Sequence, residues 1–127
     1  MKRLALIILA LALSGCAYKQ RPVYNVQDPL PFSAQSLPLE RIEALIIAGA
    51  EKRAWRVRRE ALGHLVAIQR NAKQSAEVDI QFDRQQLRIT YRNSTGMLAN
   101  EGLIHSHYNL WVRNLEADIR ARLSAGY

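Results

Sequence analysis

Two stretches of the chain place apolar residues at the spacing of an amphipathic helix, one on each side of a region with a different pattern. The first runs from about residue 38 to 54, and Pro38 suits its first helical position. The second runs from about residue 104 to 123. Their apolar faces are Ile42, Leu45, Ile46, Gly49 and Ala50 in the first, and Tyr108, Trp111, Val112, Leu115, Ile119 and Leu123 in the second. Because Gly49 and Ala50 are small, we expect a neighbouring element to approach the first helix closely there.

Between the helices, apolar and polar residues alternate with a period of two, which predicts strands with one buried and one solvated face. Four strands are indicated, at about 55–60, 66–69, 77–83 and 87–92, with Val66 and Ile68 as the inward residues of the second. Short connections predict an antiparallel meander. They lie at Leu62-Gly63, at Lys73-Gln74-Ser75 and at Arg84-Gln85.

The last of these turns predicts a register. Folding the chain at Arg84-Gln85 sets Ile80 opposite Ile89 and Val78 opposite Tyr91 on the inner face. On the outer face, the same turn sets Gln81 opposite Arg88 and Glu77 opposite Arg92. We expect the carboxylates of this strand, Glu77, Asp79 and Asp83, to form ion pairs with the arginines of the next strand. Apolar pattern and charge pattern therefore agree on one register.

We predict an α+β fold: a four-stranded antiparallel meander sheet with an N-terminal and a C-terminal helix packed on one face (α-β-β-β-β-α). Residues 37–127 form this single domain, and 93–102 form a polar loop within it. Residues 16–36 contain several prolines and no sustained period, which indicates an extended tether. Its apolar residues leave open that part of it packs on the domain or on a partner. They are Val23, Tyr24, Val26, Leu30 and Phe32.

The start of the chain, residues 1–15, has the layout of a signal peptide. A basic Lys2-Arg3 precedes an apolar run from Leu4 to Leu13, which is too short to span a membrane as about 20 residues would. The run leads into Leu13-Ser14-Gly15-Cys16, which resembles the lipobox of bacterial lipoproteins. That resemblance implies cleavage before Cys16 and attachment of acyl chains to it, an anchor that several chains make effectively permanent. By analogy with enteric sorting, Ala17 implies the outer membrane, with the domain in the periplasm.

Export also constrains composition and partners. Cys16 is the only cysteine, so its acylation would leave neither a free thiol nor a disulfide. The formal charge of +7 becomes about +5 once Lys2 and Arg3 are removed. Such a charge suits an anionic lipid, a glycan phosphate or an acidic envelope protein, whereas export makes nucleic acid an unsuitable partner. The densest positive cluster spans 53–59, with Arg56 and Arg58 expected on the wet face of the first strand. It could bind an anion or an acidic partner, or its charge could simply protect a sheet edge from unwanted pairing.

The remaining chemical candidates lie around His105. His105 and Asn109 are four residues apart and Tyr108 lies between them, so they could form a recognition patch or poise a histidine for proton transfer. The alternative is that His105 and Asn109 satisfy backbone groups of the preceding loop while Tyr108 belongs to the core. His105 and His107 are expected to point to different sides of a helix. We expect neither a metal site nor a cofactor.

Two longer stretches add a resemblance. The segment from Ile89 to Ser94, the segment from Ile104 to Leu115, and a helix ending before Trp55 are similar to small proteobacterial lipoproteins of uncharacterised function. The resemblance implies a compact α+β domain in the cell envelope and supplies no catalytic residue. We therefore expect a non-enzymatic binding or structural module. The alternatives are binding of anionic lipid or lipopolysaccharide through Arg53–Arg59, and a small hydrolase using His105.

Overall fold

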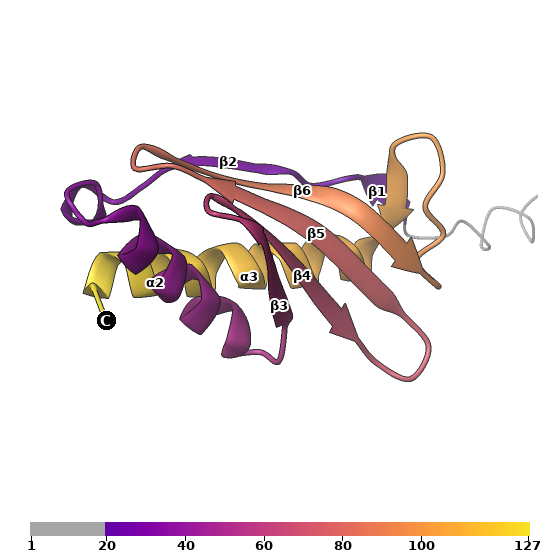
Figure 1. The fold of residues 1–127 in the computed structure, drawn as a ribbon. Coiled ribbons are helices and arrows are strands. Elements are labelled where there is room, and N and C mark those ends of the chain that lie inside the picture. The colour runs from indigo at the N-terminus through magenta and orange to yellow at the C-terminus, as the bar shows by residue number, and fades with distance from the viewer. Residues whose placement is uncertain (1–19) are drawn as a thin grey trace, which may run out of the picture.

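The computed structural model describes residues 20–127, which fold as an α+β domain with two long helices over one sheet (Figure 1). The predicted signal peptide and Cys16 lie outside the described residues. The helices and strands, in chain order, are β1 (Gln20–Pro22), β2 (Val26–Pro29), the short 3-10 helix η1 (Phe32–Ala34), α2 (Leu39–Glu51), β3 (Arg56–Ala61), β4 (His64–Arg70), β5 (Ser75–Phe82), β6 (Gln86–Thr95), β7 (Leu103–His105) and α3 (Ser106–Ala125).

The predicted meander is present, but the sheet is larger than predicted. Its five antiparallel strands lie in the order β2-β6-β5-β4-β3, and β1 and β7 form a separate antiparallel pair. The β3–β4 turn depends on Gly63, whose φ of +90° suits a residue without a Cβ. The expected class is thus confirmed, and the expected number of strands is wrong.

The extra strands come from the segment that we expected to be an extended tether through residue 36. β2 pairs with β6, placing Val26 opposite Ile89, and Val26 and Leu30 are buried in the core. β1 pairs with β7, placing Gln20 opposite His105. The segment docks because its apolar residues find partners far along the chain. From Gln20 onward it therefore belongs to the domain.

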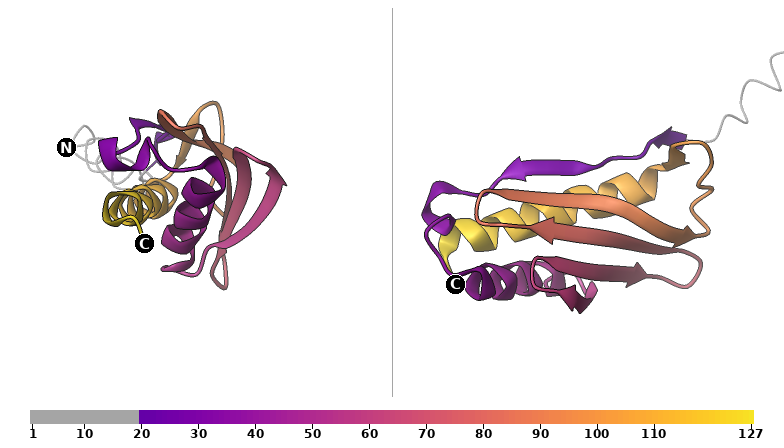
Figure 2. Two further views of the ribbon diagram at one scale, coloured as in Figure 1. Left: turned by 60° about the vertical axis from the view of Figure 1, so that its left-hand side comes forward. Right: turned by 45° about the horizontal axis from the view of Figure 1, so that its top comes forward.

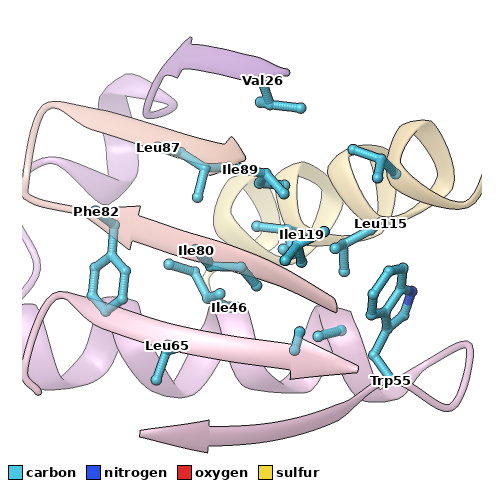
Figure 3. Packing of buried hydrophobic residues seen from close by; sticks show 14 of the residues in the cluster. Val26, Ile46, Trp55, Leu65, Ile80, Phe82, Leu87, Ile89, Leu115 and Ile119 are labelled. Carbon is cyan, nitrogen blue, oxygen red and sulfur yellow. The ribbon is translucent and has the colours of Figure 1, made fainter. Parts of the chain in front are cut away.

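Both helices cover the same face of the sheet, as the end-on view in Figure 2 shows. Side chains from α2, α3 and the inner sheet face meet in one layer, including Ile46, Ile80 and Ile119 (Figure 3). The expected close approach occurs at Gly49. A Cβ built on Gly49 would lie 2.7 Å from the Cα of Ile119, so the two helix backbones nearly touch.

Both helices and their neighbours differ slightly from the predicted bounds. α2 ends at Glu51 rather than near 54, because the backbone turns into the left-handed region at Ala54, with φ of 65°. Ile104 and His105 do not begin α3, since they pair with β1 as part of β7. β6 continues to Thr95, three residues into the predicted loop.

Two predictions about the sheet were wrong: which residues of β4 face the core, and one residue pair in the β5–β6 hairpin. Leu65 and Ala67, rather than Val66 and Ile68, share the inner face, because Leu65 pairs with Ile80. In the β5–β6 hairpin, three of the four predicted pairs are present. Glu77 instead lies opposite Asn93, since a β-bulge at this point shifts the register by one residue.

Candidate functional site

The predicted site residues fall into two separate regions of the domain. His105, Tyr108 and Asn109 lie where β7 joins α3, at the end of the molecule that holds β1 (Figure 1). Arg56 and Arg58 lie on β3, at the edge of the sheet. We call the first region the β1/β7 end: β1, β7, the loop 96–102, the turn 71–74 and the first turns of α3. Cys16 is outside the described residues.

His105 is the N-cap of α3. Its Nδ1 accepts a hydrogen bond from the backbone N–H of His107 at 3.0 Å, satisfying one of the free donors of the first helical turn. Because His105 precedes the helix, its ring does not diverge from that of His107, contrary to our prediction. The ring centroids are 4.4 Å apart. His107 in turn hydrogen-bonds Gln74 Oε1 through its Nδ1 at 3.1 Å, which joins the helix to the turn 71–74.

Asn109 joins α3 to the connection between β1 and β2. Its Oδ1 accepts from the backbone N–H of Tyr24 at 2.9 Å, and its Nδ2 donates to the backbone carbonyl of Pro22 at 2.9 Å. An amide side chain can satisfy a backbone donor and a backbone acceptor at once. Asn109 therefore has the backbone-satisfying role that we considered, with partners in the N-terminal segment rather than in the preceding loop.

Tyr108 belongs to the core. Its side chain is fully buried, its ring meets that of Tyr91 edge to face with centroids 5.5 Å apart, and its hydroxyl has no protein hydrogen-bond partner. Burial raises the pKa of this hydroxyl far above its ordinary value, so the ring stays neutral. A residue in this position contributes packing and presents no surface to a ligand.

The docked N-terminal segment adds a polar contact that sequence reasoning missed. The hydroxyl of Tyr24 donates to Glu116 Oε1 at 2.6 Å, and the guanidinium of Arg113 lies over the Tyr24 ring, 4.0 Å from its centroid. Burial and the nearby Asp28 raise the pKa of Glu116. The apolar character of the segment was the available signal that Tyr24 would pack on the domain.

A shallow hollow of about 580 Å³ opens at the β1/β7 end. Much of its wall is apolar, and the residues that line it include Ala72, Lys73, Leu98, His105 and His107. Leu98, Leu103 and Leu110 are 50%, 41% and 53% exposed at this end of the molecule. The other exposed large apolar side chains of the described residues, Phe32, Leu62 and Tyr127, lie outside this region, so three of the six gather at one end.

On the outer face of the sheet, charged side chains form an outer-face ion cluster. It consists of Arg58, Glu60, His64, Glu77, Asp79 and Arg92. At its centre, Asp79 Oδ1 lies 2.7 Å from His64 Nε2 and 2.8 Å from Arg92 Nη1. Burial raises the pKa of Asp79, but hydrogen bonds from His64 and Arg92 outweigh it and hold that pKa below its ordinary value. The role of His64 was missed, because it appears only when the β4–β5 register is known.

The arginines of 53–59 do not form one continuous anion site. Arg53 Nε donates to the buried Asp118 at 2.7 Å, whereas Arg58 contacts Glu60 and Glu77 on the other face. Arg59 Nε approaches Glu43 Oε2 at 3.2 Å, without the alignment of a hydrogen bond. Arg56 and Arg58 do share the wet sheet face as predicted. Most of the positive charge of this segment is balanced by carboxylates of the same chain.

Within residues 20–127, no group of three or more His, Cys, Asp or Glu side chains is arranged to hold a metal ion. None of the helices in that range is long and apolar enough to cross a bilayer. We compared the chain with models of protein families, with curated proteins and with solved structures, and none of the three comparisons found a match.

Proposed function

We propose that the chain is an envelope lipoprotein, anchored by acyl chains on Cys16, whose domain acts as a non-enzymatic binding or structural module. The observation that carries the proposal is the ordered series of a basic start, an apolar run and Leu13-Ser14-Gly15-Cys16. Ala17 favours the outer membrane, with the domain facing the periplasm. The resemblance to small proteobacterial lipoproteins supports the same location.

The geometry of the domain favours binding over catalysis. The three residues considered as catalytic or binding candidates have structural roles. His105 caps α3, Asn109 hydrogen-bonds two backbone groups, and Tyr108 is buried in the core. A hydrolase using His105 as the base would need one ring nitrogen free to accept the proton of a nucleophile, with the ring oriented by a third group. Its Nδ1 accepts the backbone N–H of His107, so in the neutral ring Nε2 carries the proton and neither nitrogen is a free acceptor.

Anionic lipid or lipopolysaccharide could still bind the arginines of 53–59. Such binding would have to displace carboxylates that already pair with Arg53 and Arg58. Arg56 is exposed on the wet face and is the arginine of this group best placed to contact an external anion. We keep an envelope protein, an anionic lipid or a glycan as the classes of partner.

Anchor and location are tested together by labelling cells with an alkyne analogue of palmitate and separating the membranes. We expect the wild type to carry label and to fractionate with the outer membrane. Cys16→Ala should lose the label and leave the membrane fraction, and Ala17→Asp should keep the label but move to the inner membrane. An unlabelled wild-type chain would overturn the proposal.

The binding role needs a separate experiment. A photo-reactive amino acid is placed at exposed positions on the outer sheet face and at the end of the domain opposite β1, and intact cells are irradiated. We expect at least one position to capture a specific envelope protein, lipid or glycan. Failure at every exposed position, with the protein correctly localised, would refute a binding role and leave the anchor standing.

A further inference from the structure

The first described residue, Gln20, lies on β1 at the end of the molecule opposite the C-terminus (Figure 2). It follows Cys16 by four residues, and four residues of fully extended chain span at most about 14 Å. The headgroup layer on each side of a bilayer is roughly 5–7 Å deep. If Cys16 carries the lipid, the β1/β7 end is therefore held beside the headgroups, since the chain is too short to place it elsewhere.

The surface at this end is apolar where it could meet lipid. Leu98 and Leu103 both adjoin β1: Gln20 Nε2 donates to the Leu98 carbonyl at 2.8 Å, and Leu103 pairs with Pro22. Leu103 alternates with the buried Ile104, so it points away from the core. Leu110, in the first turns of α3, shares a second hollow with Arg21 and Pro22. Three exposed leucines, from the loop 96–102, β7 and α3, thus lie close to β1.

Positive charge surrounds these leucines. Arg21 is exposed on β1, Lys73 is exposed in the turn 71–74, and Arg113 lines the hollow that contains Leu110. The carboxylate on this end surface is that of Glu101, in the loop 96–102. Cations around an apolar patch match the chemistry of a membrane surface with anionic headgroups.

We propose that the β1/β7 end is a membrane-docking surface, with Leu98, Leu103 and Leu110 inserted among the headgroups of an anionic lipid leaflet. This inference rests on the proposed lipid anchor at Cys16. Docking orients the domain: its long axis stands on the bilayer, with η1 and the C-terminus directed away from the membrane. The lipid anchor and the docking surface together then hold the domain at a fixed height above the bilayer, whereas a long tether would let that height vary.

The test uses the full lipidated protein, reconstituted into vesicles of phosphatidylethanolamine and phosphatidylglycerol. Single substitutions Leu98→Cys and Leu110→Cys add a free thiol for an environment-sensitive fluorophore, because the sulfur of Cys16 is blocked by its lipid. Phe32→Cys is the matched control, since Phe32 is 89% exposed on η1 at the far end. Quenching by nitroxide-labelled lipids reports contact with the bilayer, and circular dichroism confirms that each variant is folded.

We expect nitroxide lipids to remove about half or more of the emission at positions 98 and 110 and little at position 32, because only a probe within the headgroup layer meets the quencher. Equal quenching at the three positions in a lipidated protein would overturn the docking surface and leave the proposed anchor intact. An intact mass without acyl chains would overturn both.

Charge-removing substitutions test whether the surface prefers anionic lipid. Arg21→Gln with Lys73→Gln should lower quenching at position 98 in phosphatidylglycerol vesicles, and adding salt to the wild type should have the same effect. The control pair Arg84→Gln with Arg122→Gln removes the same charge from exposed positions away from this surface, and it should change little. Equal behaviour of the two pairs would overturn the preference for an anionic leaflet.

Discussion

α2 and α3 contact each other closely at Gly49. Replacing Gly49 by Ala therefore sets two effects against each other, a gain in helix propensity and a steric clash, and the sign of the stability change shows which is larger. Replacing Gly49 by Ala in the middle of a helix should stabilise the helix by about 1 kcal/mol, because Ala has less backbone freedom to lose. The added Cβ, however, would lie 2.7 Å from the Cα of Ile119 and 2.9 Å from the carbonyl oxygen of Asp118. Both are backbone atoms, which cannot rotate out of the way.

Ordinary contacts between carbon atoms are about 3.5–4.0 Å, so the helices would have to separate by roughly 1 Å. Overpacking of this kind costs about 1–3 kcal/mol. We therefore expect Gly49→Ala to destabilise the domain by about 1 kcal/mol net. In a domain of this size, that loss lowers the midpoint of thermal unfolding by roughly 4–8 °C.

The assay is thermal and urea unfolding of residues 17–127, followed by circular dichroism. Ala44→Gly is the control, because Ala44 is exposed on the same helix and reports helix propensity alone. We expect the control to lose about 1 kcal/mol. A Gly49→Ala variant that unfolds at a higher temperature than the wild type would refute the close helix contact.

Three further predictions follow from single side chains. Asn109→Ala should destabilise the domain by about 1–3 kcal/mol, since two backbone groups of the β1–β2 connection lose their partners; hydrogen exchange should show the loss at 20–29 first. Tyr108→Phe should stabilise the domain by about 1 kcal/mol in urea unfolding, because it removes a buried hydroxyl without a protein partner. Asp79→Asn should be less stable than the wild type at neutral pH. Because the pKa of Asp79 is lowered from 3.8, the difference should persist above that value and shrink as pH falls below it, and a pH-independent difference would contradict the assignment.

The parts of the fold that could be predicted are those in which neighbouring stretches of sequence carry matching patterns. β5 and β6 alternate strictly and are joined by a short turn, so the pairs Ile80–Ile89 and Val78–Tyr91 could be predicted. The predicted pair of Glu77 was wrong, because the alternation of apolar and polar residues does not reveal the extra residue of a β-bulge. The prediction of which β4 residues face the core was wrong, because Leu65 to Ile68 are consecutive apolar residues and fit either orientation of the strand.

β1 and β2 were missed for a different reason. Strands of three and four residues with a proline at the end of each resemble an extended linker. What makes them strands is their pairing with β7 and β6, which local sequence does not reveal. The same limit applies to the site: Asn109 was a sound candidate for holding backbone, but its partners lie 85 and 87 residues away.

That separation also has a consequence for the order of assembly. Contacts between the N-terminal segment and α3 close the longest loop in the domain, so they should form late, after the β3–β6 meander. If the chain is exported as proposed, residues 20–29 can dock only after α3 has emerged. Acylation of Cys16, as proposed, would then precede this docking, and completion of the fold would bring β1 and β7 close to the lipid.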